Sequence, residues 1–188
     1  MRRTTGGIPI SDFLEFDDPT LGYFPFVEHG VNYKIPYSQM VNWFGAQLTN
    51  YGLSDMQGNS TATTIASISV PVAVSGAFSS AFAENFTWTS GSKLTYGGLD
   101  SRTFTVSADI TVQPSSSTNK AISVYIAQDG VVIANSRMEA VVSTALPVQI
   151  HTEFFVLMGT GSYIEIFVQN ATDTTSVLVS RAILKANG

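Results

Sequence analysis

The feature that most restricts the fold of this chain is a regular alternation of apolar and polar residues in its second half. In the segment 102–112, every second residue is apolar and the residues between are mostly Thr, Ser or Asp. The apolar residues are Phe104, Val106, Ala108, Ile110 and Val112. Because successive side chains of a strand point to opposite faces, this pattern is typical of a strand with one dry and one wet face. A chain built largely from such segments forms an antiparallel β-sandwich.

Strand-like segments follow one another from about residue 61 to the C-terminus, with Gly, Asn, Asp and Ser turns between them. Asp129-Gly130 is one of the strongest short hairpin signals, because it favours the tight turn of two antiparallel strands. The expected strands are 61–70, 85–89, 93–96, 103–113, 121–128, 131–136, 138–143, 148–157, 163–169 and 176–185. This regular spacing predicts an all-β sandwich or jelly roll.

Composition divides the chain into three zones. Residues 1–50 are rich in aromatic and acidic side chains, 51–60 hold two glycines and show no periodicity, and 61–188 carry the strand pattern. We expect an N-terminal anchoring region, a linker and the β-sandwich domain. The first zone predicts a hairpin that turns at Glu28-His29-Gly30 and a short helix over 37–48. Such a small unit needs a neighbour to cover its rings. The residues expected to make that contact are Phe24, Phe26, Tyr33, Ile35, Trp43 and Phe44.

Charge and composition exclude several classes of function. The net charge is −5, and the nine Lys and Arg residues are scattered, whereas nucleic-acid binding needs a basic stripe. The chain has no cysteine, which excludes disulfides, a thiolate nucleophile and a cysteine-based zinc site. No segment approaches the ~18 continuous apolar residues of a membrane span, so we expect no membrane insertion. Nothing in the sequence predicts a cofactor.

Large apolar side chains also occupy the face that a monomer would leave wet. Phe155 and Leu157 lie on that face of one expected strand, Phe167 on that of the next, and Tyr125 on that of an earlier one. Either these rings belong to the core in another register, or they meet another subunit. We favour contact between subunits of a cyclic homo-oligomer, because exposed patches of this size are uncommon on monomers. The charged fraction of only 12% agrees with that choice.

Four segments follow one another in a particular order. They are the alternating strand at 102–112, the Asp-Gly hairpin at 121–136, the Gly-Ser-Tyr-Ile-Glu strand at 161–170 and the closing strand at 179–184. This order resembles the trimeric jelly-roll domains of the complement C1q and tumour necrosis factor type. The resemblance implies a homotrimer, whose interface we place at Tyr125, Phe155, Leu157 and Phe167.

Domains of this style are common in bacteriophage virion proteins, and the stretch 10–36 resembles the short virion-attachment leader of phage fibre proteins. The resemblance implies a head fibre, tail fibre or capsid decoration whose N-terminus docks on another virion protein, in the capsid or the tail. The chain lacks the long repetitive shaft of fibre proteins and the collagen-like repeat of C1q. The Ser/Thr/Asn-rich loops 113–119 and 170–175 suit weak polar contact with a glycan of the host surface.

Candidate catalytic groups are few, and we expect no enzyme activity. His151 and Glu153 share a strand face, but no serine motif or metal set accompanies them, so a surface pair is the favoured interpretation. The acidic cluster at Asp17-Asp18 lacks the ligand spacing of a calcium loop. Two alternatives stay open. One is a carbohydrate-binding module of a larger assembly. The other is a polysaccharide hydrolase, which requires Glu153 and Glu165 to face each other across about 5–9 Å.

Overall fold

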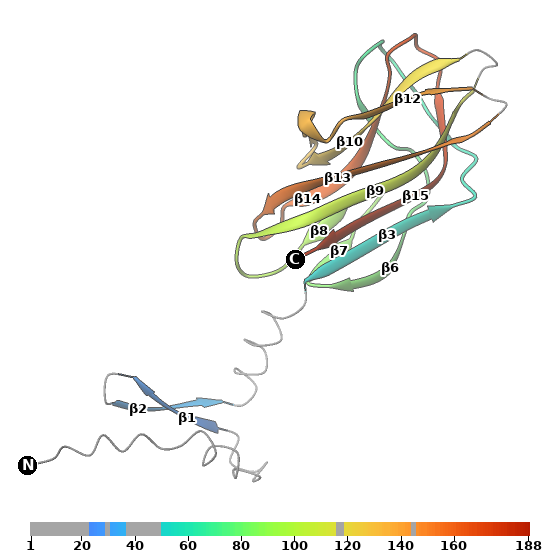
Figure 1. Cartoon of the computed structure of the whole chain (residues 1–188). Coiled ribbons are helices and arrows are strands. Elements are labelled where there is room, and N and C mark those ends of the chain that lie inside the picture. The colour runs from blue at the N-terminus through green and yellow to red at the C-terminus, as the bar shows by residue number, and fades with distance from the viewer. Residues whose placement is uncertain (1–22, 29–30, 37–49, 116–118, 144–145) are drawn as a thin grey trace, which may run out of the picture. The chain divides into compact units, whose positions relative to one another are not determined.

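A computed structural model of the chain describes residues 23–28, 31–36, 50–115, 119–143 and 146–188. The chain forms two compact units, residues 1–48 and 49–188 (Figure 1). The described part of the first unit is an antiparallel hairpin of β1 (Tyr23–Glu28) and β2 (Val31–Pro36). Its register sets Phe24 opposite Ile35 and Phe26 opposite Tyr33. The expected hairpin is therefore confirmed, whereas its turn at His29-Gly30 and the helix expected over 37–48 lie outside the described residues.

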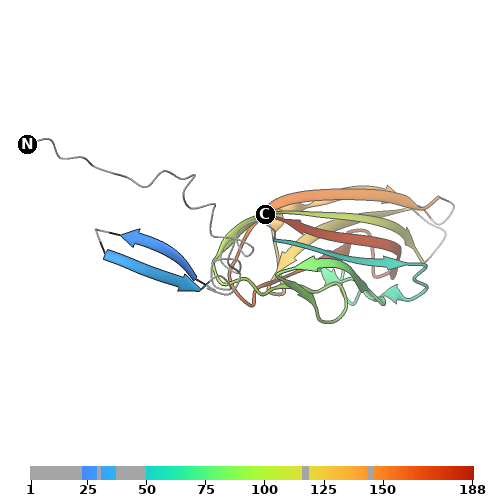
Figure 2. The ribbon, with the colours of Figure 1, turned by 90° about the horizontal axis from the view of Figure 1, so that it is seen from below.

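The second unit is a sandwich of two antiparallel sheets, which Figure 2 shows as two layers. We name each sheet after a long strand within it. The β9 sheet consists, in spatial order, of β13 (Val148–Met158), β9 (Arg102–Pro114), β15 (Val177–Asn187), β3 (Tyr51–Gln57) and β6 (Ser79–Glu84), with β4 (Ala62–Thr63) also paired to β15. The β10 sheet consists of β11 (Val131–Val132), β10 (Lys120–Gln128), β14 (Tyr163–Asn170), β8 (Leu94–Tyr96) and β7 (Phe86–Trp88), with β12 (Met138–Val142) paired to β10 and β5 (Val72–Ala73) paired to β14.

From β8 onward the chain passes repeatedly from one sheet to the other. It runs from β8 in the β10 sheet to β9, back to β10, and then to β13, β14 and β15 in alternating sheets. Only the β10–β11–β12 stretch, which includes the 3-10 helix η2 (Ala134–Ser136), stays in one sheet. This crossing pattern of antiparallel strands is that of a jelly roll. The predicted fold class is confirmed.

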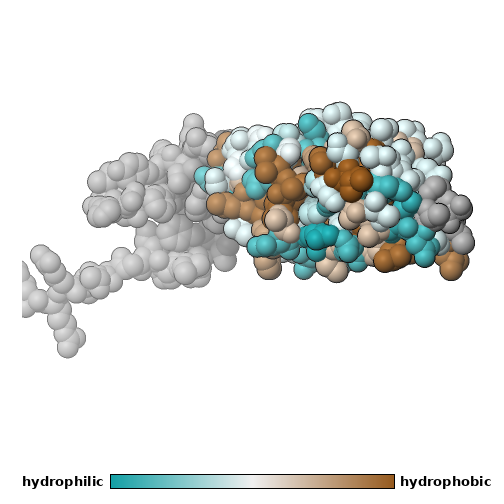
Figure 3. Space-filling view, turned by 90° about the horizontal axis from the view of Figure 1, so that it is seen from above, coloured by the Kyte–Doolittle hydropathy of each residue, from teal (hydrophilic) through white to brown (hydrophobic). Residues whose placement is uncertain are grey.

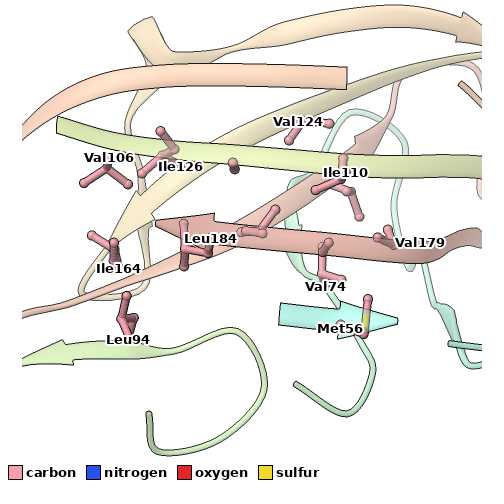
Figure 4. Close-up of a cluster of buried hydrophobic side chains, with 14 of the residues drawn as sticks. Met56, Val74, Leu94, Val106, Ile110, Val124, Ile126, Ile164, Val179 and Leu184 are labelled. Carbon is pink, nitrogen blue, oxygen red and sulfur yellow. The ribbon is translucent and has the colours of Figure 1, made fainter. Parts of the chain in front are cut away.

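The core lies between the sheets and is filled by the inward half of each alternating strand. Figure 4 shows Val106 and Leu184 from the β9 sheet near Ile126 and Ile164 from the β10 sheet, all fully buried. The alternation that predicted β9 is therefore realised as a strand with one face in the core. Three rings close the core around the ends of β7, β8 and β9, those of Phe86, Tyr96 and Phe104, with centroids 4.9–5.2 Å apart.

The sandwich has two distinct ends. At one end, which we name the base, the Gly188 N–H donates to the Asn50 carbonyl at 3.0 Å, so the unit begins and finishes there. At the other end, the tip, the Ser115 N–H donates to the Ser176 carbonyl at 3.0 Å. Strand β9 runs from base to tip over 13 residues. At about 3.3 Å per residue, the two ends are roughly 40 Å apart.

Two segments differ from the sequence-based expectation. The stretch expected to be a linker, 51–60, supplies strand β3, which pairs with β15 and β6. Its alternation is hard to read because two of its three core-facing residues, Gly52 and Ser54, are small or polar, and only Met56 gives an apolar signal. At Gly52 an added Cβ would lie 2.7 Å from the Leu94 side chain. Conversely, only two residues of the strand expected over 61–70 form one, the short β4.

The Asp129-Gly130 turn is confirmed. Both residues have positive φ, 52° and 81°, as a type I′ hairpin turn requires, and β10 pairs with β11 on either side of them. The strand that follows is shorter than expected, because the chain leaves the sheet at η2 and returns as β12. Ser136, at the end of η2, is buried and its hydroxyl accepts a hydrogen bond from the Ile126 N–H at 2.9 Å.

Candidate functional surfaces

The four residues expected at a trimer interface lie on two different faces of the sandwich. Tyr125 and Phe167 are directly opposite each other on β10 and β14 and point away from the core. Phe155 and Leu157 are on β13, in the other sheet, and also point outward. The sequence reasoning grouped these rings because all of them fall on wet positions. Wet positions of opposite sheets, however, face opposite directions.

Exposure separates the two pairs further. Phe155 is 68% exposed and Leu157 is 63% exposed. Tyr125 is only 7% exposed, and its hydroxyl donates to the side-chain carbonyl of Gln169. Phe167 is half-buried. The interface role of all four residues stays a prediction, but within one protomer only Phe155 and Leu157 leave most of their surface open.

The outer face of the β9 sheet carries two apolar edges. Phe155 and Leu157 form the β13 edge. The other side of the sheet carries a second apolar group, which we name the β3 edge. It consists of Tyr51 and Leu53 on β3 and of Phe82 on the outermost strand β6, directly opposite Leu53. At the level of these edges, the strands between them present the polar side chains Thr105, Ser107, Lys185 and Asn187, while the half-buried Ile183 lies farther along β15. Exposed apolar side chains form several separate patches among hydrophilic ones on the side of the molecule that Figure 3 shows. The sandwich thus has more than one apolar surface to cover.

His151 lies on the same outer face, on the edge strand β13. Its Nδ1 is 2.8 Å from the Oδ1 of Asp109, its direct cross-strand neighbour on β9. The His151 side chain is 56% exposed. The predicted pair of His151 with Glu153 is not observed. His151 instead pairs with Asp109, because cross-strand neighbours are closer than residues two apart on one strand.

The outer face of the β10 sheet has a different construction. Tyr125, Ala127 and Glu165 are buried there although they lie outside the core between the sheets. Two hydrogen-bonded groups cover part of this face. The Ser123 hydroxyl donates to Glu139 at 2.9 Å, and the Arg137 guanidinium donates to the Ser123 oxygen at 3.1 Å. The outer face of this sheet therefore holds buried polar side chains, Ser123 and Glu165, beside the buried Tyr125 and Ala127.

Glu165 is the buried acid of this face. It is 4% exposed, and it faces away from the core between the half-buried side chains of Tyr163 and Phe167. Burial raises the pKa of the Glu165 carboxyl above its usual value of 4.5, and the positive charge of Lys93 partly opposes this effect. The Lys93 ammonium lies over the Tyr163 ring, 4.4 Å from its centroid.

The pair required for a glycosidase is not assembled. Glu153 is exposed on the outer face of the β9 sheet, and Glu165 is buried on the outer face of the β10 sheet. The core separates these two faces, so the carboxyl groups point away from each other. The hydrolase alternative required these two carboxyl groups to face each other, and the structure does not provide that arrangement.

The loop 170–175 at the tip is held by its own hydrogen bonds. Asn170 is fully buried, and its side-chain carbonyl accepts from the Thr172 N–H at 2.9 Å while its amide donates to Asp173 at 3.0 Å. The buried Lys120 ammonium pairs with Asp173 at 2.5 Å. The hydrogen bonds from Lys120 and then from Thr175, whose N–H donates to Asp173 at 2.9 Å, hold the pKa of the Asp173 carboxyl well below its usual range.

The second tip loop is described only at its ends. Ser115 and Asn119 are exposed, and residues 116–118 lie outside the described residues. The described ends of this loop lie beside the loop 170–175, since the Ser115 N–H donates to the Ser176 carbonyl at 3.0 Å and Lys120, the residue after Asn119, pairs with Asp173.

Of the expected anchoring residues, Phe24, Phe26, Tyr33 and Ile35 lie in the β1–β2 hairpin. Trp43 and Phe44 lie outside the described residues, as does the acidic cluster at Asp17-Asp18. Within the described part of the chain, no group of three or more His, Asp or Glu side chains could hold a metal ion. No helix in that part is long and apolar enough to cross a membrane.

Comparison with known proteins identifies similar structures but no sequence family. The sequence matches no protein-family model and no curated protein. The structure is similar to murine APRIL, with a TM-score of 0.47 and 7% identity over 73% of this chain and 99% of that one. It is also similar to the PRD1 vertex protein P5, with a TM-score of 0.44 and 11% identity over 74% of this chain and 96% of that one. A third similar structure is the globular domain of zebrafish complement 1qA, with a TM-score of 0.45 and 9% identity over 73% of this chain and 94% of that one. The jelly-roll assignment rests on the strand order of the two sheets.

Proposed function

We propose that this chain is a non-enzymatic bacteriophage structural protein, a homotrimeric fibre or decoration that docks on the virion through its N-terminal region. The observation that carries the proposal is the polarity of the β-sandwich. The described part of the unit begins at Asn50, at the base, and the loop 170–175 and the described ends of the loop 113–119 lie at the tip, roughly 40 Å away. A domain connected at its base presents its tip outward. This arrangement suits attachment at one end and contact with a host at the other.

The two apolar edges of the β9 sheet support an assembly in which one edge meets the other edge of a neighbouring subunit. A two-fold dimer that pairs each edge with the opposite edge of its partner covers both edges, and so does a closed ring. In a closed ring, the β13 edge of one subunit meets the β3 edge of the next, and one kind of interface covers both. The proposed contact brings Phe155 and Leu157 of one subunit to Leu53 and Phe82 of its neighbour. We assign three subunits because the sequence resembles trimeric domains.

Particle location and subunit number test the proposal. Light scattering on the purified full chain should give three times the chain mass of 20.1 kDa. Labelling of assembled particles with an antibody against the β-sandwich should place the domain on the outside of the capsid or tail. A clean monomer at micromolar concentration would contradict the ring, and absence of the chain from purified particles would contradict the virion assignment.

The carbohydrate-binding module is the second candidate. The outer face of the β10 sheet favours it, because half-buried aromatic side chains and a buried acid lie together there. A module of this kind binds a glycan whether or not it is a trimer and whether or not it is carried on a particle. Glycan binding by a monomeric chain that is missing from particles would favour this candidate over the fibre.

A further inference from the structure

The carboxyl group of Glu165 on the outer face of the β10 sheet accepts no hydrogen bond from the described residues. The residue as a whole is 4% exposed. The neighbouring polar side chains of the same face are satisfied, since Tyr125 donates to Gln169 and Ser123 donates to Glu139. Among the described residues, only the Ser54 hydroxyl is both fully enclosed and without a hydrogen-bond partner, so the Glu165 oxygens reach the surface. Glu165 is therefore an acceptor on this face to which a ligand can donate.

Aromatic rings flank the acid on both sides. Tyr163 and Phe167 lie two residues before and after Glu165 on β14, so all three side chains stand on the same face of the sheet. Both rings are half-buried, which leaves part of each available for contact. The Gly130 turn borders the same place, because an added Cβ there would lie 3.4 Å from the Tyr163 hydroxyl and 4.0 Å from Oε1 of Glu165.

The charges around Glu165 restrict the class of ligand. The carboxylate repels anions, and the Lys93 ammonium, which lies over the Tyr163 ring, repels cations. A neutral molecule with several hydroxyl donors satisfies the acid without either repulsion. Aromatic rings favour a partner that also presents an apolar C–H face. A neutral pyranose has both features.

We propose that the outer face of the β10 sheet binds a neutral sugar unit, with Glu165 accepting hydrogen bonds from its hydroxyl groups and Tyr163 and Phe167 contacting its apolar face. The site is on the flank of the sandwich, away from the tip loops to which glycan contact was first assigned. The inference rests on the glycan-binding part of the proposed function. It requires neither the trimer nor the virion location.

Binding of neutral and charged sugars to the full chain tests the site. Isothermal titration calorimetry would use oligomers of glucose, galactose, mannose and N-acetylglucosamine, with an oligomer of galacturonate as the charged counterpart. At least one neutral oligomer should bind, and galacturonate should bind more weakly. Glu165→Gln should weaken that binding at least about tenfold, because hydrogen bonds to charged groups contribute about 1.5–3 kcal/mol. Tyr163→Leu, which removes one ring, should weaken it as well.

The matched control is Glu153→Gln, which makes the same chemical change at an exposed glutamate on the opposite sheet. It should leave the affinity unchanged, and circular dichroism should show that all variants keep the wild-type fold. Unchanged affinity in Glu165→Gln would overturn the site. If Glu165→Gln bound normally and Thr174→Ala, a substitution in the tip loop 170–175, abolished binding, the chain would still be a glycan-binding protein, with its site at the tip. Preference for galacturonate, or binding of no neutral oligomer, would also overturn the inference, while the oligomer mass and particle labelling would still test the proposed function.

Discussion

The two outer faces of the sandwich share one sequence pattern but differ in whether the chain itself covers the aromatic side chains. Both carry aromatic side chains at positions that simple alternation leaves wet. On the β10 sheet, Tyr125 is opposite Phe167 and bonds to Gln169, so the ring is covered within the chain. On the β9 sheet, Phe155 lies on the edge strand β13. Its cross-strand neighbour is the small Thr105 on β9, and Phe155 stays exposed. An aromatic residue on a wet face therefore indicates an interface only when its cross-strand neighbours leave it uncovered.

The largest effect should separate the two faces of a single strand. Ile164 and Phe167 are both on β14, but Ile164 is in the core and Phe167 is on the outer face. Ile164→Ala should lower the free energy of unfolding by about 2–5 kcal/mol, because it leaves a cavity. Phe167→Ala should cost about 1 kcal/mol or less, the size of one cross-strand contact. Urea unfolding at one fixed protein concentration measures both. Equal losses would show that the outer layer is as tightly packed as the core.

The next effect concerns the exposed face. Replacing Phe155 and Leu157 together by Ser should dissociate the proposed trimer, because it removes the apolar surface of the β13 edge. Light scattering would then report one chain mass instead of three. Val131→Ser is the control, since Val131 is an exposed apolar residue on the hairpin of the other sheet. A trimer that survives the double substitution would exclude the β13 edge as the contact.

A smaller effect is expected from the acid at the tip. The folded-state pKa of Asp173 is held below its ordinary value of 3.8, so its ionised form stabilises the fold. That contribution is present above pH 3.8 and is lost as the pH falls through the folded-state pKa. Asp173→Asn should therefore lower the thermal midpoint at pH 7, with the deficit shrinking below pH 3.8. A deficit that is constant from pH 7 to pH 2 would mean that the Lys120 pair does not act through charge.

The smallest effect, of opposite sign, belongs to Glu165. Its folded-state pKa is raised above 4.5, so the folded chain binds the proton more tightly than the unfolded chain. Stability therefore falls as the pH rises from 4.5 through the folded-state pKa. Glu165→Gln should be more stable than the wild type at pH 7 and equal to it near pH 4, as thermal unfolding at the two values would show. A less stable variant at pH 7 would mean that the ionised carboxyl contributes to the fold.

The outer faces also show how much of the candidate site the sequence predicts. Alternation places Glu165, Tyr163 and Phe167 on one face, and the same rule places Phe155 and Leu157 on one face. It does not say that Glu165 is buried, because that depends on neighbours in other strands and in the turns beside them. The loop at Asn170 is a similar case, since its Asn and Asp residues predict turn bonds but not the ion pair with the distant Lys120.

The sequence alone determined the strands that have one apolar face and the hairpin at Asp129-Gly130, because period-2 alternation and turn chemistry are local. Its order of segments also predicted the jelly roll. Only the tertiary structure decided that Tyr51–Gln57 is a strand, since Gly52 gives no apolar signal and is small because the other sheet approaches closely. It also decided which outer rings are covered. Covering depends on side chains that are far apart in the chain, and local periodicity carries no information about them.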